Sequence, residues 1–95
     1  MKFLVDKGFD KELVEKLNEK YDTTIIATMN INKNKVIAII DYFKEIGIKP
    51  IDDLLLARPE IFLNDLEFIK KIFAINNLEE TVNKINEDIT YIDKI

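Results

Sequence analysis

The stretch GIKPIDDLLLARPEIFLND, residues 47–65, decides the fold, because it sets a proline between a run of leucines and a second apolar cluster. Pro59 has no amide hydrogen, and it disfavours helical geometry at the residue before it. The leucine helix is therefore expected to end near Ala57. The segment PEIFL then forms a tight single turn that packs Ile61 and Phe62 inward, so the stretch predicts two helical pieces separated by a proline.

The segment before this stretch predicts the most buried helix. Asn32 is an N-cap residue type, and the positions from there to Ile46 are mostly apolar. A helix that is apolar on most of its faces is a buried one. Gly47 is the usual left-handed residue after a helix, where Ile48 folds back on Phe43 in a Schellman motif. The aromatic residues at helical spacing are expected in the same core: Tyr42, Phe43, Phe62, Phe68 and Phe73.

Two segments precede that helix, and only the first has a definite pattern. Asp10 is an N-cap residue type, and the amphipathic helix after it should extend to about Lys20. The stretch DTTIIATMNI, residues 22–31, is rich in β-branched residues and could be a strand by local propensity. No second strand-like run is present to pair with it. We expect an irregular or short helical connector there, and the choice stays open.

Two amphipathic segments follow residues 47–65. Asn64 with Glu67, and Asn77 with Glu80, have the spacing of a capping box that opens a helix. The last segment carries apolar residues at alternating spacings of 4 and 3, which suits packing along another helix. We expect one terminal helix that extends past the body of the protein. Its apolar residues are Leu78, Val82, Ile85, Ile89 and Ile92.

The sequence as a whole predicts an all-α fold, because two glycines and two prolines are the only strong helix breakers in 95 residues. The length is that of a single domain, residues 1–95. We expect a small right-angled or antiparallel array of about five to six helices. No apolar run approaches a membrane span, and MKFLVDKG lacks the apolar core of a secretory signal. A cytoplasmic protein without membrane association is therefore expected.

The helix ends also suggest an internal repeat. Apolar helix ends meet a turn residue at Gly8, Gly47 and Asn77, which are 39 and 30 positions apart. The pattern YFKEIGI, DDLLLARPEIFL and LEFIKKIF, within residues 42–73, resembles a repeat of the mitochondrial transcription termination factor (mTERF) family. Repeats of that family end a helix at Gly, run a leucine-rich helix and place a Pro before two apolar residues. The resemblance implies solenoid-like helical repeats and nucleic-acid binding through a basic concave surface.

The charge of the chain departs from that implication. The formal net charge is -4 and the sequence pI is about 4.8, which opposes binding of a phosphate backbone over most of the surface. Each local basic residue has two possible interpretations, a solvated surface side chain or a contact to nucleic acid. The candidate nucleic-acid contacts are Lys33, Lys35, Lys44, Arg58, Lys70 and Lys71.

The composition argues against catalysis. His, Cys and Ser are all absent, which removes the usual general base, two common nucleophiles and the commonest metal ligand. Carboxylates that are adjacent on a helix, such as Asp52 and Asp53, point in different directions and do not converge on one substrate. We therefore expect a protein that is not an enzyme and that uses no cofactor, metal or small-molecule substrate.

Two functions from different classes remain. The first is a small helical interaction module that binds a protein partner or forms a homodimer. The second is a nucleic-acid-binding domain of the mTERF-like type. For the first, the end of the terminal helix is the expected binding element, because the body of the protein covers it least. The candidate partner-binding residues are Ile89, Tyr91, Ile92 and Ile95.

Overall fold

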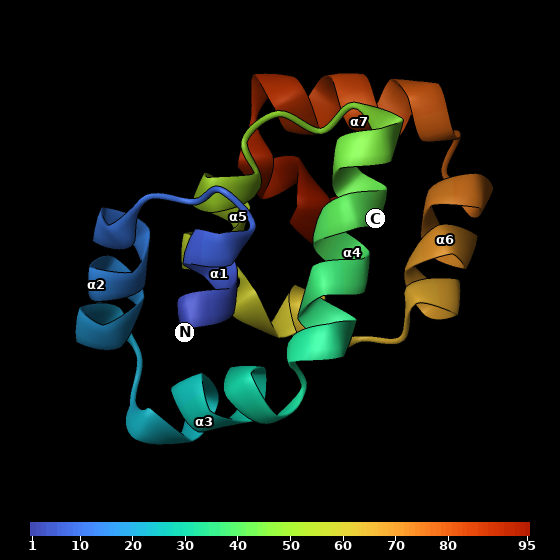
Figure 1. The fold of residues 1–95 in the computed structure, drawn as a ribbon. Helices are drawn as coiled ribbons and strands as arrows, with labels where there is room; N and C mark the ends of the chain where they lie inside the picture. The colour runs from blue at the N-terminus through green and yellow to red at the C-terminus, as the bar shows by residue number, and fades with distance from the viewer.

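Helix α4 (Lys33–Ile46) runs through the middle of the molecule and carries the centre of the core (Figure 1). The computed structural model describes all 95 residues. Four elements pack on α4: α3 (Thr23–Ile31), α5 (Ile51–Ala57), the 3₁₀ helix η1 (Pro59–Leu63) and α6 (Leu66–Ile75). The fully buried side chains of α4 are Val36, Ile39, Ile40 and Phe43.

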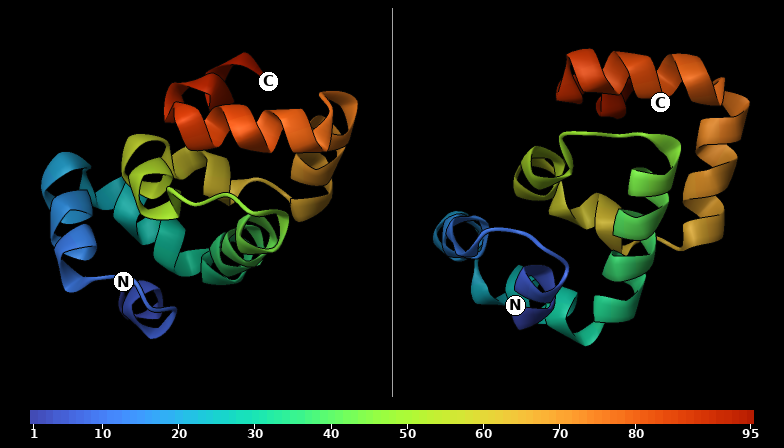
Figure 2. Two further views of the ribbon diagram at one scale, coloured as in Figure 1. Left: turned by 90° about the horizontal axis from the view of Figure 1, so that it is seen from above. Right: turned by 45° about the horizontal axis from the view of Figure 1, so that its top comes forward.

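The remaining helices close the two sides of this centre. Helices α1 (Lys2–Asp6) and α2 (Lys11–Lys20) lie beside each other, and α2 also packs on α5. Helix α7 (Leu78–Glu87) follows α6 and lies at the opposite end of α4 from α3 (Figure 1). A final 3₁₀ helix, η2 (Ile89–Lys94), turns back beside α7 (Figure 2). None of the helices combines the length and the apolar character needed to cross a bilayer.

The predicted all-α class is confirmed, but the chain forms seven α-helices and two 3₁₀ helices, more than the expected five to six. One cause is residues 22–31, which are helical despite their β-branched composition. The Asp22 carboxylate accepts a hydrogen bond from the Ile25 amide at 3.1 Å and so caps α3. With no strand to pair with, a helix satisfies the backbone groups of this segment, and it buries Met29 completely.

The helix ends expected around Pro59 and Gly47 are confirmed. Helix α5 ends at Ala57, and Pro59 opens η1, where Phe62 is fully buried and Ile61 is half-buried. Gly47 has φ 94°, and the Ile48 amide donates to the Phe43 carbonyl at 2.9 Å, which is the hydrogen bond of a Schellman motif. Both turns therefore follow from local sequence alone.

Of two predicted caps, Asn32 occupies the expected position without capping through its side chain, and Asn64 is wrong. Asn32 stands at the N-cap position of α4, but its side-chain amide donates to the Thr28 carbonyl of the preceding helix at 2.9 Å. Asn64 likewise donates to the Ile61 carbonyl at 3.0 Å, and α6 begins one residue later than expected, after Asp65. In both cases the asparagine closes the helix before it rather than opening the helix after it.

The prediction of a single terminal helix is also wrong. Helix α7 ends at Glu87, and Asp88 adopts an extended backbone that separates it from η2. The Asp88 carboxylate accepts hydrogen bonds from the amide and the hydroxyl of Thr90, at 3.0 and 2.8 Å, and so opens a new turn. The chain folds back instead of extending past the body, and Ile92 is only 7% exposed.

Candidate partner-binding groove

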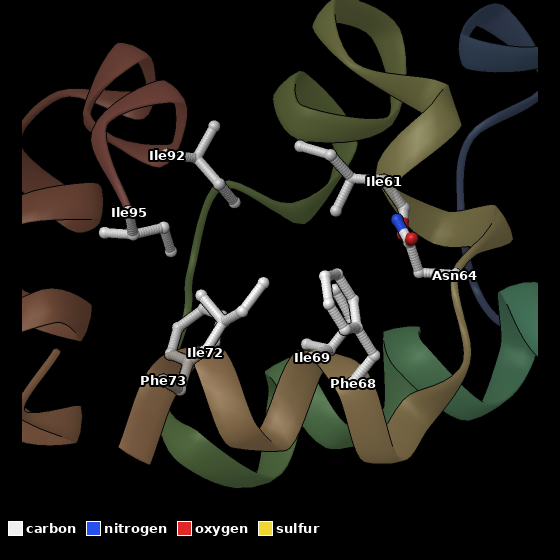
Figure 3. Close-up of a pocket in the computed structure, with 8 residues that line it drawn as sticks. All are labelled: Ile61, Asn64, Phe68, Ile69, Ile72, Phe73, Ile92 and Ile95. Atoms are coloured by element: carbon white, nitrogen blue, oxygen red, sulfur yellow. The ribbon is translucent and has the colours of Figure 1, made fainter. Parts of the chain in front are cut away.

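An apolar groove of about 150 Å³ opens between η1, α6 and η2. Figure 3 shows the side chains of these three elements converging on one open space. The groove residues are Ile61 and Asn64 near η1, Phe68, Ile69, Ile72 and Phe73 on α6, and Ile92 and Ile95 at the end of the chain. Asn64 is the single polar residue among them, so the groove is suited to apolar groups.

Helix α6 forms the floor of the groove because its apolar residues cover more of its circumference than one neighbour can bury. Ile69 and Phe73 face the core and are 5% and 1% exposed. Phe68 and Ile72 lie four residues apart and therefore share a second face, which points into the groove. Phe68 is 52% exposed, so its expected place in the core is wrong. Ile75 continues this face beyond the groove and is 82% exposed.

The opposite wall of the groove is held in place by an ion pair. The Arg58 guanidinium donates two hydrogen bonds to the Asp93 carboxylate, both at 2.9 Å, and so ties η2 to the start of η1. These hydrogen bonds raise the pKa of Arg58 and lower the pKa of Asp93. The pair is exposed to solvent, so it orients η2 more than it stabilises the fold.

The four candidate partner-binding residues are divided between two sides of η2. Ile92 and Ile95 line the groove, with Ile92 buried and Ile95 half-buried. Ile89 and Tyr91 are half-buried outside it, and the Tyr91 ring lies 5.2 Å from the ammonium group of Lys84. The structure thus brings two of the four residues into one apolar site.

Sequence reasoning missed the part of the groove that comes from α6 and η1. The sequence predicts Phe68 in the core from its helical spacing and Ile61 in the core from the turn after Pro59. A usable signal was present: the apolar residues of α6 occupy two faces, one through Ile69 and Phe73 and one through Phe68, Ile72 and Ile75. A helix with two apolar faces at the edge of a small domain leaves one of them exposed.

Four of the six candidate nucleic-acid contacts are held by protein groups. Lys33 and Lys71 are exposed and form no ion pair. The other four have carboxylate or carbonyl partners: Lys35 with Asp65 at 3.0 Å, Arg58 with Asp93 at 2.9 Å, Lys70 with Glu67 at 4.0 Å, and Lys44 with the Lys7 carbonyl at 3.3 Å. The three ion pairs are exposed to solvent, so they compete only weakly with phosphate for these cations.

No group of three or more His, Cys, Asp or Glu side chains is arranged to hold a metal ion. Comparison of the chain with protein-family models, with curated proteins and with solved structures finds no match.

Proposed function

We propose that this protein is a small, non-catalytic interaction module that takes an apolar side chain of a protein partner, or of a second copy, into the groove between η1, α6 and η2. The groove itself carries this proposal, since its lining is apolar except for Asn64 and includes Phe68, whose ring is half-exposed. Exposed apolar surface of this kind marks interaction sites on small proteins. A single large side chain buried in such a pocket supplies much of the energy of an interface.

The size of the groove supports a side chain as its occupant. Pockets for drug-sized ligands and cofactors are usually about 300–1,000 Å³, and this groove measures about 150 Å³. The Asn64 amide already donates to the Ile61 carbonyl, which leaves the side-chain oxygen to accept a hydrogen bond from a partner. The chain has no His, Cys or Ser near the groove or elsewhere, which supports a binding role over catalysis.

A displayed library of random peptides, selected on the immobilised protein, tests this function. We expect selected peptides to share one large apolar residue and to lose at least about tenfold in affinity on a Phe68→Lys variant. Ile31→Lys is the matched control, because Ile31 is 82% exposed and lies outside the groove. Peptides that bind both variants equally, or a selection that enriches none, would contradict the proposal.

Nucleic-acid binding of the mTERF-like type is the alternative. It is supported by the order of elements over residues 42–73, where α4 ends at a left-handed Gly47, the leucine-rich α5 follows, and Pro59 opens a tight turn. Solenoid-like stacking of helical repeats belongs to the same alternative. The net charge of -4 weighs against it.

A fluorescence anisotropy titration with single- and double-stranded DNA and RNA at low salt tests this alternative, because electrostatic attraction to phosphate is strongest under that condition. Binding that weakens steeply with added salt would favour it. No binding at tens of micromolar protein would remove it.

A further inference from the structure

Two residues, Asn76 and Asn77, lie between the last two long helices of the chain. Helix α6 ends at Ile75, and Asn76 keeps a near-helical backbone with φ -94° and ψ 13°. Asn77 alone leaves the right-handed region, with φ 66° and ψ 101°, and α7 begins at the next residue. Rotation of this one residue would therefore join α6 and α7 into a single helix from Leu66 to Glu87.

The conformation of Asn77 is unfavourable for a residue with a Cβ atom. It is the only residue other than glycine with a positive φ; the other two are Gly8 and Gly47, for which this conformation carries no steric cost. The ψ value also lies away from the left-handed minimum near about +47°. The sequence AINNLEE around it contains no glycine or proline, so only the capping preference of its two asparagines interrupts the helix.

Short hinges under strain favour exchange of the segment beyond them between two copies of a chain. The segment beyond this hinge, residues 78–95, is called the tail here and comprises α7 and η2. It binds the rest of the molecule through a small set of contacts that a second copy could reproduce. The Asn86 side chain donates to the Gly47 carbonyl at 3.0 Å and accepts from the Lys49 amide at 2.9 Å. Asp93 accepts from Arg58, and the apolar side chains Val82, Ile85 and Ile92 are buried.

The apolar residues on both sides of the hinge are exposed. Ile75 is 82% exposed before it and Leu78 is 40% exposed after it. In a two-fold symmetric dimer that exchanges its tails, both copies use the same surface, and the two hinges run next to each other as the chains cross. Such a crossing gives these two residues an apolar neighbour that the monomer lacks.

We propose that a second copy of this chain is the partner, and that two copies exchange their tails about Asn77. In the exchanged dimer α6 and α7 form one helix, and each tail packs on the body of the other copy with the Asn86 and Asp93 contacts unchanged. Ile92 and Ile95 of the groove are then supplied by the partner copy. This inference rests on the proposed function in one respect only, namely that the binding partner is a protein chain.

Two hinge variants test the strain at Asn77. Asn77→Gly and Asn77→Ala both remove the side-chain acceptor that caps the Glu80 amide at 3.2 Å, but only glycine accepts a positive φ freely. After refolding at several hundred micromolar, sedimentation equilibrium should show a dimer at least about tenfold tighter for Asn77→Ala than for Asn77→Gly. Equal affinities would overturn the proposal, as would a chain that stays monomeric in every form.

A charge exchange distinguishes swapped tails from an ordinary surface dimer. Arg58→Asp and Asp93→Arg each place like charges together within one chain. In a dimer of the two variants with exchanged tails, each tail instead meets an opposite charge on the other body. Native mass spectrometry after joint refolding should therefore show heterodimer well above the statistical half, whereas a statistical mixture would overturn the exchange.

The outcomes for the groove and for the exchange are separable. Peptide binding that depends on Phe68, measured on a strictly monomeric protein, would leave the proposed function standing and refute the exchange. Heterodimer enrichment without any peptide binding at the groove would support the exchange and refute the groove as a docking site.

Discussion

Helices α4 and α6 lie beside each other and are both rich in apolar residues, but only α6 leaves large apolar side chains exposed (Figure 1). Phe43 at the centre of α4 is completely covered, whereas Phe68 of α6 is 52% exposed. Helix α4 has neighbours on several sides, and α6 lies at the edge of the molecule. The difference shows that apolar residues at helical spacing predict a helix, while its position in the fold decides whether they form core or interaction surface.

The turns that end these two helices differ in the steric cost of their backbone conformation. Gly47 takes its positive φ without steric cost and is closed by the Schellman hydrogen bond from Ile48. Asn77 takes a positive φ with a Cβ atom present. The α4 corner thus has a backbone conformation that glycine favours, whereas the α6 corner carries the conformational cost on which the proposed exchange of tails rests.

Truncation of one phenylalanine on each helix should give the largest contrast. Phe43→Ala removes a fully buried ring that packs edge-on against Phe62 at a centroid distance of 5.4 Å, and it should destabilise the protein by about 3–5 kcal/mol. Phe68→Ala should cost less than about 1 kcal/mol, because half of the ring is already in water. Urea denaturation of both variants measures the contrast. Similar losses would mean that α6 belongs to the core as fully as α4.

Replacement of Gly47 and of Asn77 should change stability less than truncation of Phe43 does. Gly47→Ala introduces a conformational cost at positive φ, whereas Asn77→Gly removes one. Gly47→Ala should cost about 1–2 kcal/mol, since alanine must adopt a left-handed backbone. The added Cβ would lie 3.9 Å from Val82, an ordinary contact, so the cost is conformational and not steric. Asn77→Gly should change stability by only a few tenths of a kcal/mol, because relief at positive φ offsets the lost cap. Thermal melts of both variants measure these changes. A large loss of stability for Asn77→Gly would show that the Asn77 side chain, and not Gly47, determines the more rigid turn.

The sequence predicts the helix ends at Gly47 and Ala57 and the cap at Asn77, because the backbone groups that these signals satisfy lie within a few residues. It misses the break at Asp88 and places the start of α6 one residue early, although both are also set within one turn. The sequence does not decide the structure of residues 22–31, since β-branched composition and the lack of a pairing strand favour different structures.

The groove could be predicted only in part. Ile92 and Ile95 were proposed as partner-binding residues on a helix extending into solvent, but Asp88 ends that helix and turns them toward α6. The exposed position of Phe68 depends on which neighbours reach α6, and a local pattern of residues does not contain that information.

Removal of the amide clamp between the tail and the α4 corner should have an effect of about 1 kcal/mol. Asn86→Ala leaves the Gly47 carbonyl and the Lys49 amide without their side-chain partner. Asn83→Ala is the matched control, because Asn83 is an exposed asparagine of the same helix that makes no such hydrogen bond. Hydrogen exchange of the α7 amides should accelerate in the first variant only. Equal exchange in both would show that apolar contacts alone hold the tail.

The smallest effect should come from pH, acting on the ion pair that ties the tail to η1. The hydrogen bonds and the charge of Arg58 lower the pKa of Asp93 from its ordinary value of 3.8, so the folded state holds this carboxyl ionised in more acid solution than the unfolded state does. The pair therefore contributes its stability above that ordinary value, and the contribution is lost as pH falls through the lower pKa of the folded state. The difference in melting temperature between the natural chain and Asp93→Asn should shrink as pH is lowered from about 6 to about 3.

Asp88, whose pKa is also lowered, by the hydroxyl and amide of Thr90, is present in both proteins and cancels in the comparison. Because the pair is exposed, added salt should also reduce the difference at neutral pH. A difference that stays constant over this pH range would mean that the edge of the groove is held by Ile92 and its apolar neighbours, without help from the charges.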